Sequence, residues 1–352
     1  MQGNTDPGTP RSRIVLGIGS SHTPMLNAAL DDWPRFVELD RLRPHRDKSG
    51  RPVTYDQLLA IAGDGPAREL APELLARRHA GAMAQVEHVG AVLRGAKLDA
   101  LVIVGDDQKE LFFTDVQPSV LVYHGATIRN APLKDRPGPR WAFEASRRFY
   151  EPEVPRDYPV HQALAQHLVA ELVRDEFDIV SSDTLPEGPG RMLGEGHAFG
   201  FVHRRLLQGA DLPVVPIFLN TYYPPNQPTP RRCWRLGEAI LRAIERHPGG
   251  LRVGVIASGG LSHFTVDEEL DGRVLQALRE RDAEALCALP TAQLESGSSE
   301  IRNWICMAGA TQHLPLQHLA YIPGYRTPAG TGTGLAFGIW SAEAVPPEAT
   351  GA

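Results

Sequence analysis

The feature that most constrains the fold is a series of short, almost continuously apolar runs along the 352-residue chain. Runs this short, and rich in β-branched residues, are typical of strands that are buried on both faces of a sheet. They occupy residues 14–18, 101–104, 120–123, 214–219, 253–257 and 335–340. Apolar residues at three- and four-residue spacing predict helices at 67–93, 159–173, 230–244, 268–286 and 299–309. Strands that alternate with helices predict an α/β fold around a central, mostly parallel sheet.

No break in composition divides the chain, so we predict a single domain over residues 14–341. Residues 1–13 and 342–352 are polar or rich in small residues and Pro, and we predict that both are disordered tails. Residues 26–65 are rich in Arg, Asp and Pro and lack clear periodicity. Segments of this kind inside a compact chain are usually functional or disordered, and here we predict a long structured loop or a small insertion.

Charge and cysteine content exclude several classes of protein. The net charge of −6 and the lack of a long basic run argue against a nucleic-acid partner. No apolar stretch approaches the ~20 residues of a membrane span, and the polar first 13 residues do not resemble a signal peptide. Cys233, Cys287 and Cys306 are far apart and form no CxxC pair, which disfavours a disulfide framework or a thiolate zinc site. We expect a soluble, cytoplasmic protein without a membrane partner.

Polar clusters follow three of the predicted strands. Their sequences are GSSHTP at 19–24, GDDQ at 105–108 and SGGLSH at 258–263. Each cluster alone is compatible with a tight turn or a helix cap. In open α/β sheets, however, ligands bind beyond the carboxyl ends of the strands. If the three strands are parallel neighbours, the clusters converge, which predicts one site that contains His22 and His263.

Two further segments add candidate site residues. His197 lies among glycines in GEGHAFG at 194–200, where the backbone can approach a ligand closely or form a flexible loop. The acidic sequence VDEELD at 266–271 opens a predicted helix, where carboxylates suit the helix dipole, but one of them could turn toward His263. Two histidines and one carboxylate with open coordination positions form the facial triad that binds non-haem Fe(II) for oxygen chemistry.

Four motifs, in conserved order along the chain, carry a resemblance to a known family. They are SSHTPM at 20–25, GHAF at 196–199, GGLSH at 259–263 and SEIRNW at 299–304. With these motifs the chain resembles the class III extradiol ring-cleavage dioxygenases, and its pattern is similar to that of the catalytic β subunit of protocatechuate 4,5-dioxygenase. The resemblance runs from about residue 14 to residue 340. It implies a single α/β domain and an Fe(II) ion bound by two histidines and a glutamate.

The resemblance also implies roles for particular residues. The first metal histidine falls on His22, and the metal glutamate falls on Glu269, with Glu268 as the alternative. The acid/base histidine falls on His263. A second pocket histidine falls on His197, which would hydrogen-bond the substrate or the bound oxygen.

The second metal histidine is the point at which the sequence departs from the family. The family has an Asp-His pair after this strand, whereas Gln108 stands at the histidine position here. An amide oxygen is a poorer iron ligand than imidazole. Three readings follow: Gln108 ligates the metal, a carboxylate of Asp106 or Asp107 or a histidine such as His124 replaces it, or the chain binds no catalytic iron.

The resemblance implies an Fe(II)-dependent enzyme that cleaves a catecholic or related hydroxylated aromatic acid beside its hydroxyl pair, with O₂ as the second substrate. One alternative is a relative whose altered metal site supports non-oxidative, hydrolytic chemistry. Another is a metal-free binding or scaffold member of the same fold. We expect self-association into a homo-oligomer, and a separate small subunit encoded elsewhere is an alternative arrangement.

The insertion at 26–65 carries a group of basic residues that could contact such a substrate. They are Arg41, Arg43, His45 and Arg46. Arginine pairs bidentately with carboxylates, so these side chains could clamp a substrate acid. The alternative is that they are solvated surface charges.

Overall fold

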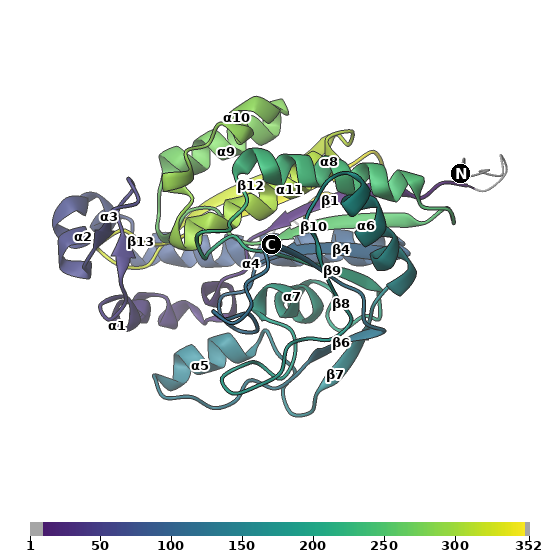
Figure 1. Ribbon diagram of the computed structural model, residues 1–352. Helices are drawn as coiled ribbons and strands as arrows, with labels where there is room; N and C mark the ends of the chain where they lie inside the picture. Colours follow the sequence, from purple (N-terminus) through teal and green to yellow (C-terminus); the bar gives the residue numbers. More distant parts are fainter. Residues whose placement is uncertain (1–9, 349–352) are drawn as a thin grey trace.

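The computed structural model describes residues 10–348, and its centre is a nine-stranded sheet (Figure 1). The strand order is β11-β13-β1-β10-β4-β9-β5-β8, and β12 also pairs with β13. The strands are β1 (Arg13–Ser20), β4 (Ala100–Gly105), β5 (Val120–Tyr123), β8 (Val180–Ser182), β9 (Val214–Leu219), β10 (Arg252–Ser258), β11 (His263–Thr265), β12 (Leu316–Tyr325) and β13 (Thr331–Ser341). All six strands predicted from the apolar runs are present.

The middle of the sheet is parallel and its flanks contain antiparallel pairs. β1 pairs with β10, β10 with β4 and β4 with β9, all in parallel. β13 runs antiparallel to β1, β11 and β12, and β5 runs antiparallel to β9. The predicted single α/β domain with a central sheet is confirmed, and the sheet is mixed, with its parallel part at the centre.

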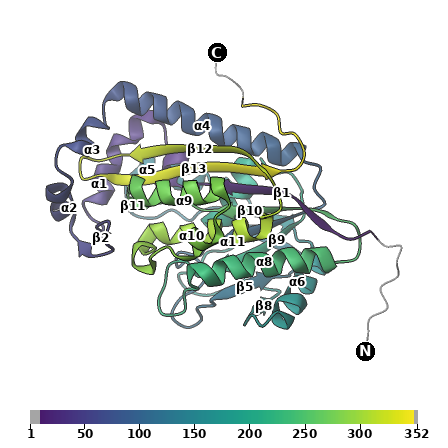
Figure 2. The same cartoon turned by 90° about the horizontal axis from the view of Figure 1, so that it is seen from above.

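Helices cover both faces of the sheet (Figure 2). One face carries α4 (Pro72–Gly95), and the other carries α6 (Gln162–Arg174), α8 (Pro230–Arg246) and α11 (Ile301–Thr311). Along β4, Val102 and Val104 pack into the core that contains α6, α8 and α11, while Leu101 and Ile103 pack into the core that contains α4. Successive side chains of a strand point to opposite faces. The central strands are therefore apolar at every position because both of their faces are buried.

The predicted helices form, and two of them are interrupted. The stretch at 67–93 becomes α3 (Gly65–Arg68) and α4, because Pro72 lies in the first turn of α4 and starts a new helix there. The stretch at 268–286 becomes α9 (Glu268–Glu280) and α10 (Ala283–Cys287). Arg281, with a φ of 57°, ends α9 in the left-handed conformation common at helix C-termini.

Residues 26–65 form a structured insertion, as predicted, built from short elements. These are η1 (Pro24–Asn27), η2 (Leu30–Asp32), η3 (Pro34–Phe36), α1 (Val37–Asp40), β2 (His45–Arg46), β3 (Pro52–Val53) and α2 (Tyr55–Ala62). The insertion is tied to the turn between β12 and β13 by a buried ion pair. Arg326 donates from Nε and Nη2 to both carboxylate oxygens of Asp40, at 2.7 and 2.8 Å. Such a bidentate pair fixes the position of α1.

Several elements were not predicted from the sequence. They are β6 (Thr127–Asn130) and β7 (Arg156–Pro159), which pair with each other, α5 (Arg140–Arg147), α7 (His197–Phe201), η4 (Val202–Leu206), η5 (Thr291–Gln293) and η6 (Ser296–Glu300), together with β8, β11 and β12. β12 is a half-exposed strand with His, Gln, Gly and Pro among its ten residues, so it lacks the continuous apolar run of the central strands.

The predicted tails are shorter than expected within the described residues. Ser12 is buried and its hydroxyl bonds to His247 Nδ1 at 3.0 Å, although it falls in the predicted N-terminal tail. Beyond residue 341, the exposed Glu343 forms an ion pair with Arg252, so this part of the predicted C-terminal tail contacts the domain. Residues 1–9 and 349–352 lie outside the described part of the chain. Over residues 10–348, no helix has the length and apolar character needed to cross a membrane.

Candidate metal centre and active site

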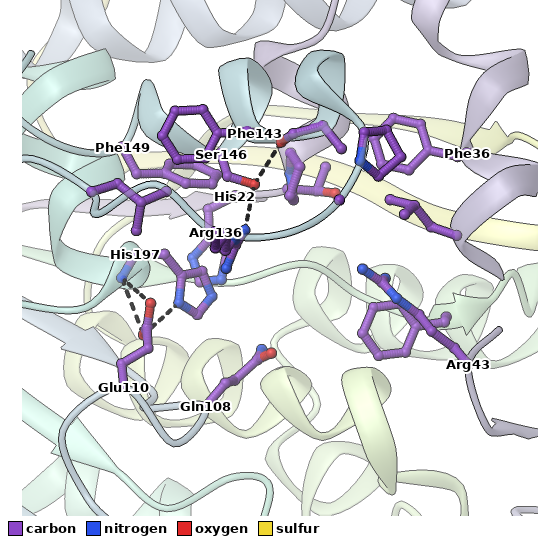
Figure 3. Close-up of a pocket in the computed structure, with 18 of the residues that line it drawn as sticks. His22, Phe36, Arg43, Gln108, Glu110, Arg136, Phe143, Ser146, Phe149 and His197 are labelled. Carbon is purple, nitrogen blue, oxygen red and sulfur yellow. Dashed lines mark hydrogen bonds and ion pairs between the residues drawn. The ribbon is translucent and has the colours of Figure 1, made fainter. Parts of the chain in front are cut away.

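The three polar clusters meet at one edge of the sheet, as predicted. They follow β1, β10 and β4, which are adjacent and parallel, so their carboxyl ends lie side by side. His22, His263 and Gln108 from these clusters all line one cavity of about 480 Å³ (Figure 3). The cavity is also lined by His197 and Glu300, which come from α7 and from the end of η6.

Three side chains in this cavity have the chemistry and spacing of a metal centre. Potential ligand atoms of His22, His197 and Glu300 all lie within 4.8 Å of one another. His22 Nε2 is 3.4 Å from a Glu300 carboxylate oxygen, and the His22 and His197 rings meet edge to face with centroids 4.6 Å apart. Two imidazoles and one carboxylate are the donor set of a facial triad.

The hydrogen bonds of His22 leave one ring nitrogen available to a cation. Ser258 Oγ donates its proton to the carbonyl of Ala198 at 2.6 Å, so it accepts from His22 Nδ1 at 2.9 Å. His22 Nε2 therefore carries a lone pair; it is buried without a hydrogen-bond partner and faces Glu300. Burial is the main cause that lowers the pKa of His22, which keeps this ring neutral. A lone pair beside a carboxylate is stabilised by a cation between them, so these residues fit a metal ion.

His197 is held by a carboxylate on its other ring nitrogen. Its Nδ1 lies 2.8 Å from Glu110 Oε2, and Tyr150 donates to Glu110 Oε1 at 2.7 Å. Burial alone would lower the pKa of His197, but Glu110 outweighs it and raises that pKa to about 10. A carboxylate in this position fixes ring orientation and raises ligand basicity.

The glycine before His197 makes this contact sterically accessible. Gly196 is the N-cap of α7, and a Cβ at this position would lie 2.3 Å from Glu110 Oε2. The glycine-rich motif was predicted to let the backbone approach a ligand. Its glycine at 196 instead lets the Glu110 carboxylate approach the backbone N–H and ring of His197, at 3.0 and 2.8 Å.

Glu300 is an acceptor for groups from three segments. Its Oε2 accepts from Gly260 N–H at 2.7 Å, and its Oε1 lies 3.0 Å from His263 Nε2 and 2.9 Å from Gln108 Nε2. Burial alone would raise the pKa of Glu300, but His263 is the largest opposing influence, and that pKa is held well below its usual range. Glu300 is therefore an anion in a site that is almost closed to solvent.

His263 is positioned between the backbone and Glu300. Its Nδ1 donates to the carbonyl of Leu261 at 2.9 Å, and its Nε2 faces Glu300 at 3.0 Å. Burial opposes the charged ring, yet Glu300 raises the pKa of His263 above its ordinary value. Because Nδ1 is engaged by the backbone, Nε2 is the nitrogen that can exchange a proton within the cavity.

Four residues were candidates for the position of the family's second metal histidine, and they occupy different environments. They are Gln108, Asp106, Asp107 and His124. Gln108 donates from Nε2 to Glu300 and to Asp106, the latter at 3.3 Å, so its amide nitrogen and not its oxygen faces the metal-centre carboxylate. Asp107 accepts from the backbone N–H groups of residues 111 and 112, which stabilise the loop. His124 bonds to Ser181 and does not line the cavity. Burial, followed by the charge of Glu300, raises the pKa of Asp106 to about 8.

The prediction that Glu269 is the metal carboxylate needs correction. Glu269 and its alternative Glu268 are exposed in the first turn of α9, where Glu268 accepts from Tyr325 at 2.8 Å. Neither of them lines the cavity. The carboxylate beside the histidines is Glu300, in the matched motif SEIRNW at 299–304. That motif is the only signal for Glu300 in the sequence, because nothing in its local pattern marks a ligand.

Fold and site together define an α/β protein with a candidate mononuclear centre at the carboxyl ends of parallel strands. The chain belongs to the LigB family, described as the catalytic LigB subunit of aromatic ring-opening dioxygenase, whose match covers residues 140–335. This match confirms the family that the motifs predicted. It includes His197, His263 and Glu300, whereas His22 and Gln108 lie before it.

Individual relatives carry names of the same kind. The chain is 30% identical over 185 residues to a gallate dioxygenase of Pseudomonas putida, covering 47% of this chain and 52% of that protein. It is 28% identical over 224 residues to a 2,3-dihydroxyphenylpropionate/2,3-dihydroxicinnamic acid 1,2-dioxygenase of Cupriavidus necator, covering 62% of this chain and 61% of the relative. The matched part of the chain thus spans between about half and three fifths of these relatives.

Proposed function

We propose that this protein is an Fe(II)-dependent dioxygenase that opens the ring of a catecholic or related hydroxylated aromatic acid in extradiol fashion. The observation that carries the proposal is the grouping of His22, His197 and Glu300 around one point of a cavity that His263 also lines. The description of the family as an aromatic ring-opening dioxygenase supports ring cleavage as the class of reaction, and the relatives are named dioxygenases. In the net reaction both atoms of O₂ enter the product, and a C–C bond beside the hydroxyl pair breaks. One of its carbons becomes a carboxylic acid and the other an aldehyde or ketone.

In this proposal His22, His197 and Glu300 hold the metal. When bound, Fe(II) supplies the redox chemistry that allows a chelated catecholate to react with O₂. His22 would bind through Nε2, since its Nδ1 is engaged by Ser258. His197 would also bind through Nε2, since its Nδ1 faces Glu110. Gln108 then donates a hydrogen bond to Glu300 and is not a metal ligand, in contrast to the residue at this position in the family pattern.

His263 is the residue that we assign to proton transfer. Its Nε2 lies in the cavity, and it would take a proton from a substrate hydroxyl and return it later in the reaction. General acid–base catalysis of this kind contributes typically 10²–10⁴-fold to a rate. The hydrogen bond from Nδ1 to Leu261 keeps the ring in place while Nε2 exchanges its proton.

The apolar wall of the cavity suits an aromatic ring. Phe36, Phe143, Phe149 and Phe264 line it together with prolines of the segment before α5. Aromatic side chains prefer edge-to-face or offset contact with another ring. They would orient the substrate and limit the access of water to the reacting carbons.

The test is O₂ consumption by protein purified anaerobically and loaded with Fe(II). Catechol, 3,4-dihydroxybenzoate and 3-(2,3-dihydroxyphenyl)propionate are the substrates to compare. We expect stoichiometric consumption of O₂ with at least one of them, together with the conjugated absorbance of a ring-opened semialdehyde acid. Product formed without O₂ uptake would favour the hydrolytic alternative. Iron-loaded protein that leaves every ring intact would contradict the proposal and favour a binding function.

A further inference from the structure

The cavity of the candidate centre also contains two arginines that have no carboxylate partner among residues 10–348. Arg43 comes from the insertion, and Arg136 comes from the segment before α5. The Arg136 guanidinium donates to Ser146 Oγ at 3.1 Å, and no ion pair joins either arginine to a described carboxylate. In Figure 3, Arg43 reaches into the cavity from the side opposite His197 and Glu110.

The other charged groups of the cavity are already matched with opposite charges. Glu110 is paired with His197, and Glu300 with His263. Arg326, the third arginine that lines the cavity, is neutralised by Asp40 through its bidentate ion pair. Arg43 and Arg136 are therefore the charged side chains of the described cavity wall that lack an ion-pair partner.

Arg43 and Arg136 line the same cavity, and Arg136 is among the charges that act on Arg43. Burial, followed by the positive charge of Arg326, lowers the pKa of Arg43; the Asp40 carboxylate opposes this shift, and Arg136 acts in the same direction as Arg326. Neighbouring cations in a partly desolvated site are stabilised by an anion that binds between them. Guanidinium groups match a carboxylate in geometry as well as in charge.

We propose that Arg43 and Arg136 form an anion subsite that binds the carboxylate of an aromatic acid, with the ring of that acid extending toward the His22–His197–Glu300 centre. The proposed function is the basis for expecting an aromatic ring in the substrate. The two arginines that are unpaired among the described residues of the cavity are the basis for expecting a carboxylate on it. An acid whose carboxylate is held by the two arginines presents its ring to the centre, so the two arginines fix which end of the substrate faces it. The insertion at 26–65 thereby supplies Arg43 as a residue that selects substrates with a carboxylate.

Binding to metal-free protein tests the subsite separately from ring cleavage. The probes are benzoate and 3-phenylpropionate, which lack the hydroxyl pair, and their neutral amides, benzamide and 3-phenylpropanamide. We expect at least one acid to bind more tightly than its amide by isothermal titration calorimetry. Arg43→Gln and Arg136→Gln should each weaken binding of that acid by roughly 10- to 100-fold, because a charge-assisted hydrogen bond is lost, and leave amide binding unchanged.

Two further variants separate a specific contact from a general change in charge. Arg41→Gln removes the same charge from the same loop, but Arg41 packs over Tyr55 and does not line the cavity, so acid binding should be unchanged. Arg43→Lys keeps the charge without the forked donors and should give an intermediate affinity. The subsite is refuted if neither acid binds better than its amide, or if Arg41→Gln weakens acid binding as much as Arg43→Gln. Failure of the O₂ assay alone would overturn the proposed function and leave this binding result intact.

Discussion

At the scale of single residues, the contact between Glu110 and His197 is the main difference between this centre and the family pattern. The loop after β4 carries no histidine at the family position, yet the same loop supplies Glu110, which holds the ring of His197 beside His22. Gln108 from that loop donates to Glu300. The loop therefore contacts two of the three candidate ligands, His197 and Glu300. His197 thus supplies a second imidazole to the site, although Gln108 stands at the position where the family has its second metal histidine.

Glu110→Gln tests this positioning role. We expect the affinity for Fe(II) to fall by roughly 10- to 100-fold, the range typical for loss of the group that orients a metal-binding histidine. Glutamine keeps the size of the side chain but loses the charge that orients His197. Anaerobic Fe(II) titration gives the affinity, and the melting temperature reports whether the fold is kept. Glu144→Gln, at a half-buried site on α5 where the side chain pairs with Arg140 and does not line the cavity, is the matched control and should bind iron like the parent. Unchanged affinity in Glu110→Gln would contradict the positioning role of Glu110.

At the scale of elements, the strands and helices that could be predicted are those marked by a pattern of apolar residues within their own sequence. The strands beyond which His22 and His263 lie are continuous apolar runs, and their adjacency brings both histidines into one cavity. Glu300 could not be placed in this way, because it reaches the site through η6 and α11 and lies 37 residues from His263. The resemblance implied Glu269 as the metal glutamate, whereas the start of α9 leaves that side chain exposed. Glu269 lies six residues from His263 along the chain, and this closeness does not bring it into the cavity.

The packing of α8 on α11 offers a test of how tightly the elements behind the site are held. A Cβ at Gly237 of α8 would lie 2.0 Å from the backbone oxygen of Cys306 in α11. Gly237→Ala should therefore destabilise the protein by about 1–3 kcal/mol, as overpacking does, despite the better helix propensity of alanine. Gly272→Ala on α9, where a Cβ meets no atom within 4 Å, is the control and should stabilise by up to ~1 kcal/mol. Urea unfolding measures both, and equal effects would refute the close approach.

At the scale of the whole molecule, the cavity is assembled from segments distributed along the chain. His22 follows the first strand, Gln108 follows β4, His197 begins α7, and His263 and Glu300 come from the last third of the sequence. The insertion adds Arg43 to the same cavity. A fragment limited to the family match at 140–335 would therefore lack His22, Gln108 and Arg43.

The central claim is that His22, His197 and Glu300 hold the metal, and the most direct measurement is iron stoichiometry in two matched variants. Glu300→Gln removes the buried carboxylate of the centre, and Glu269→Gln removes the exposed carboxylate that the family pattern suggested. Both proteins are loaded with Fe(II) anaerobically at one pH, desalted and analysed for bound iron. We predict that Glu269→Gln retains the iron content of the parent and that Glu300→Gln loses most of it. Full iron in Glu300→Gln, or loss of iron in Glu269→Gln, would contradict the assignment.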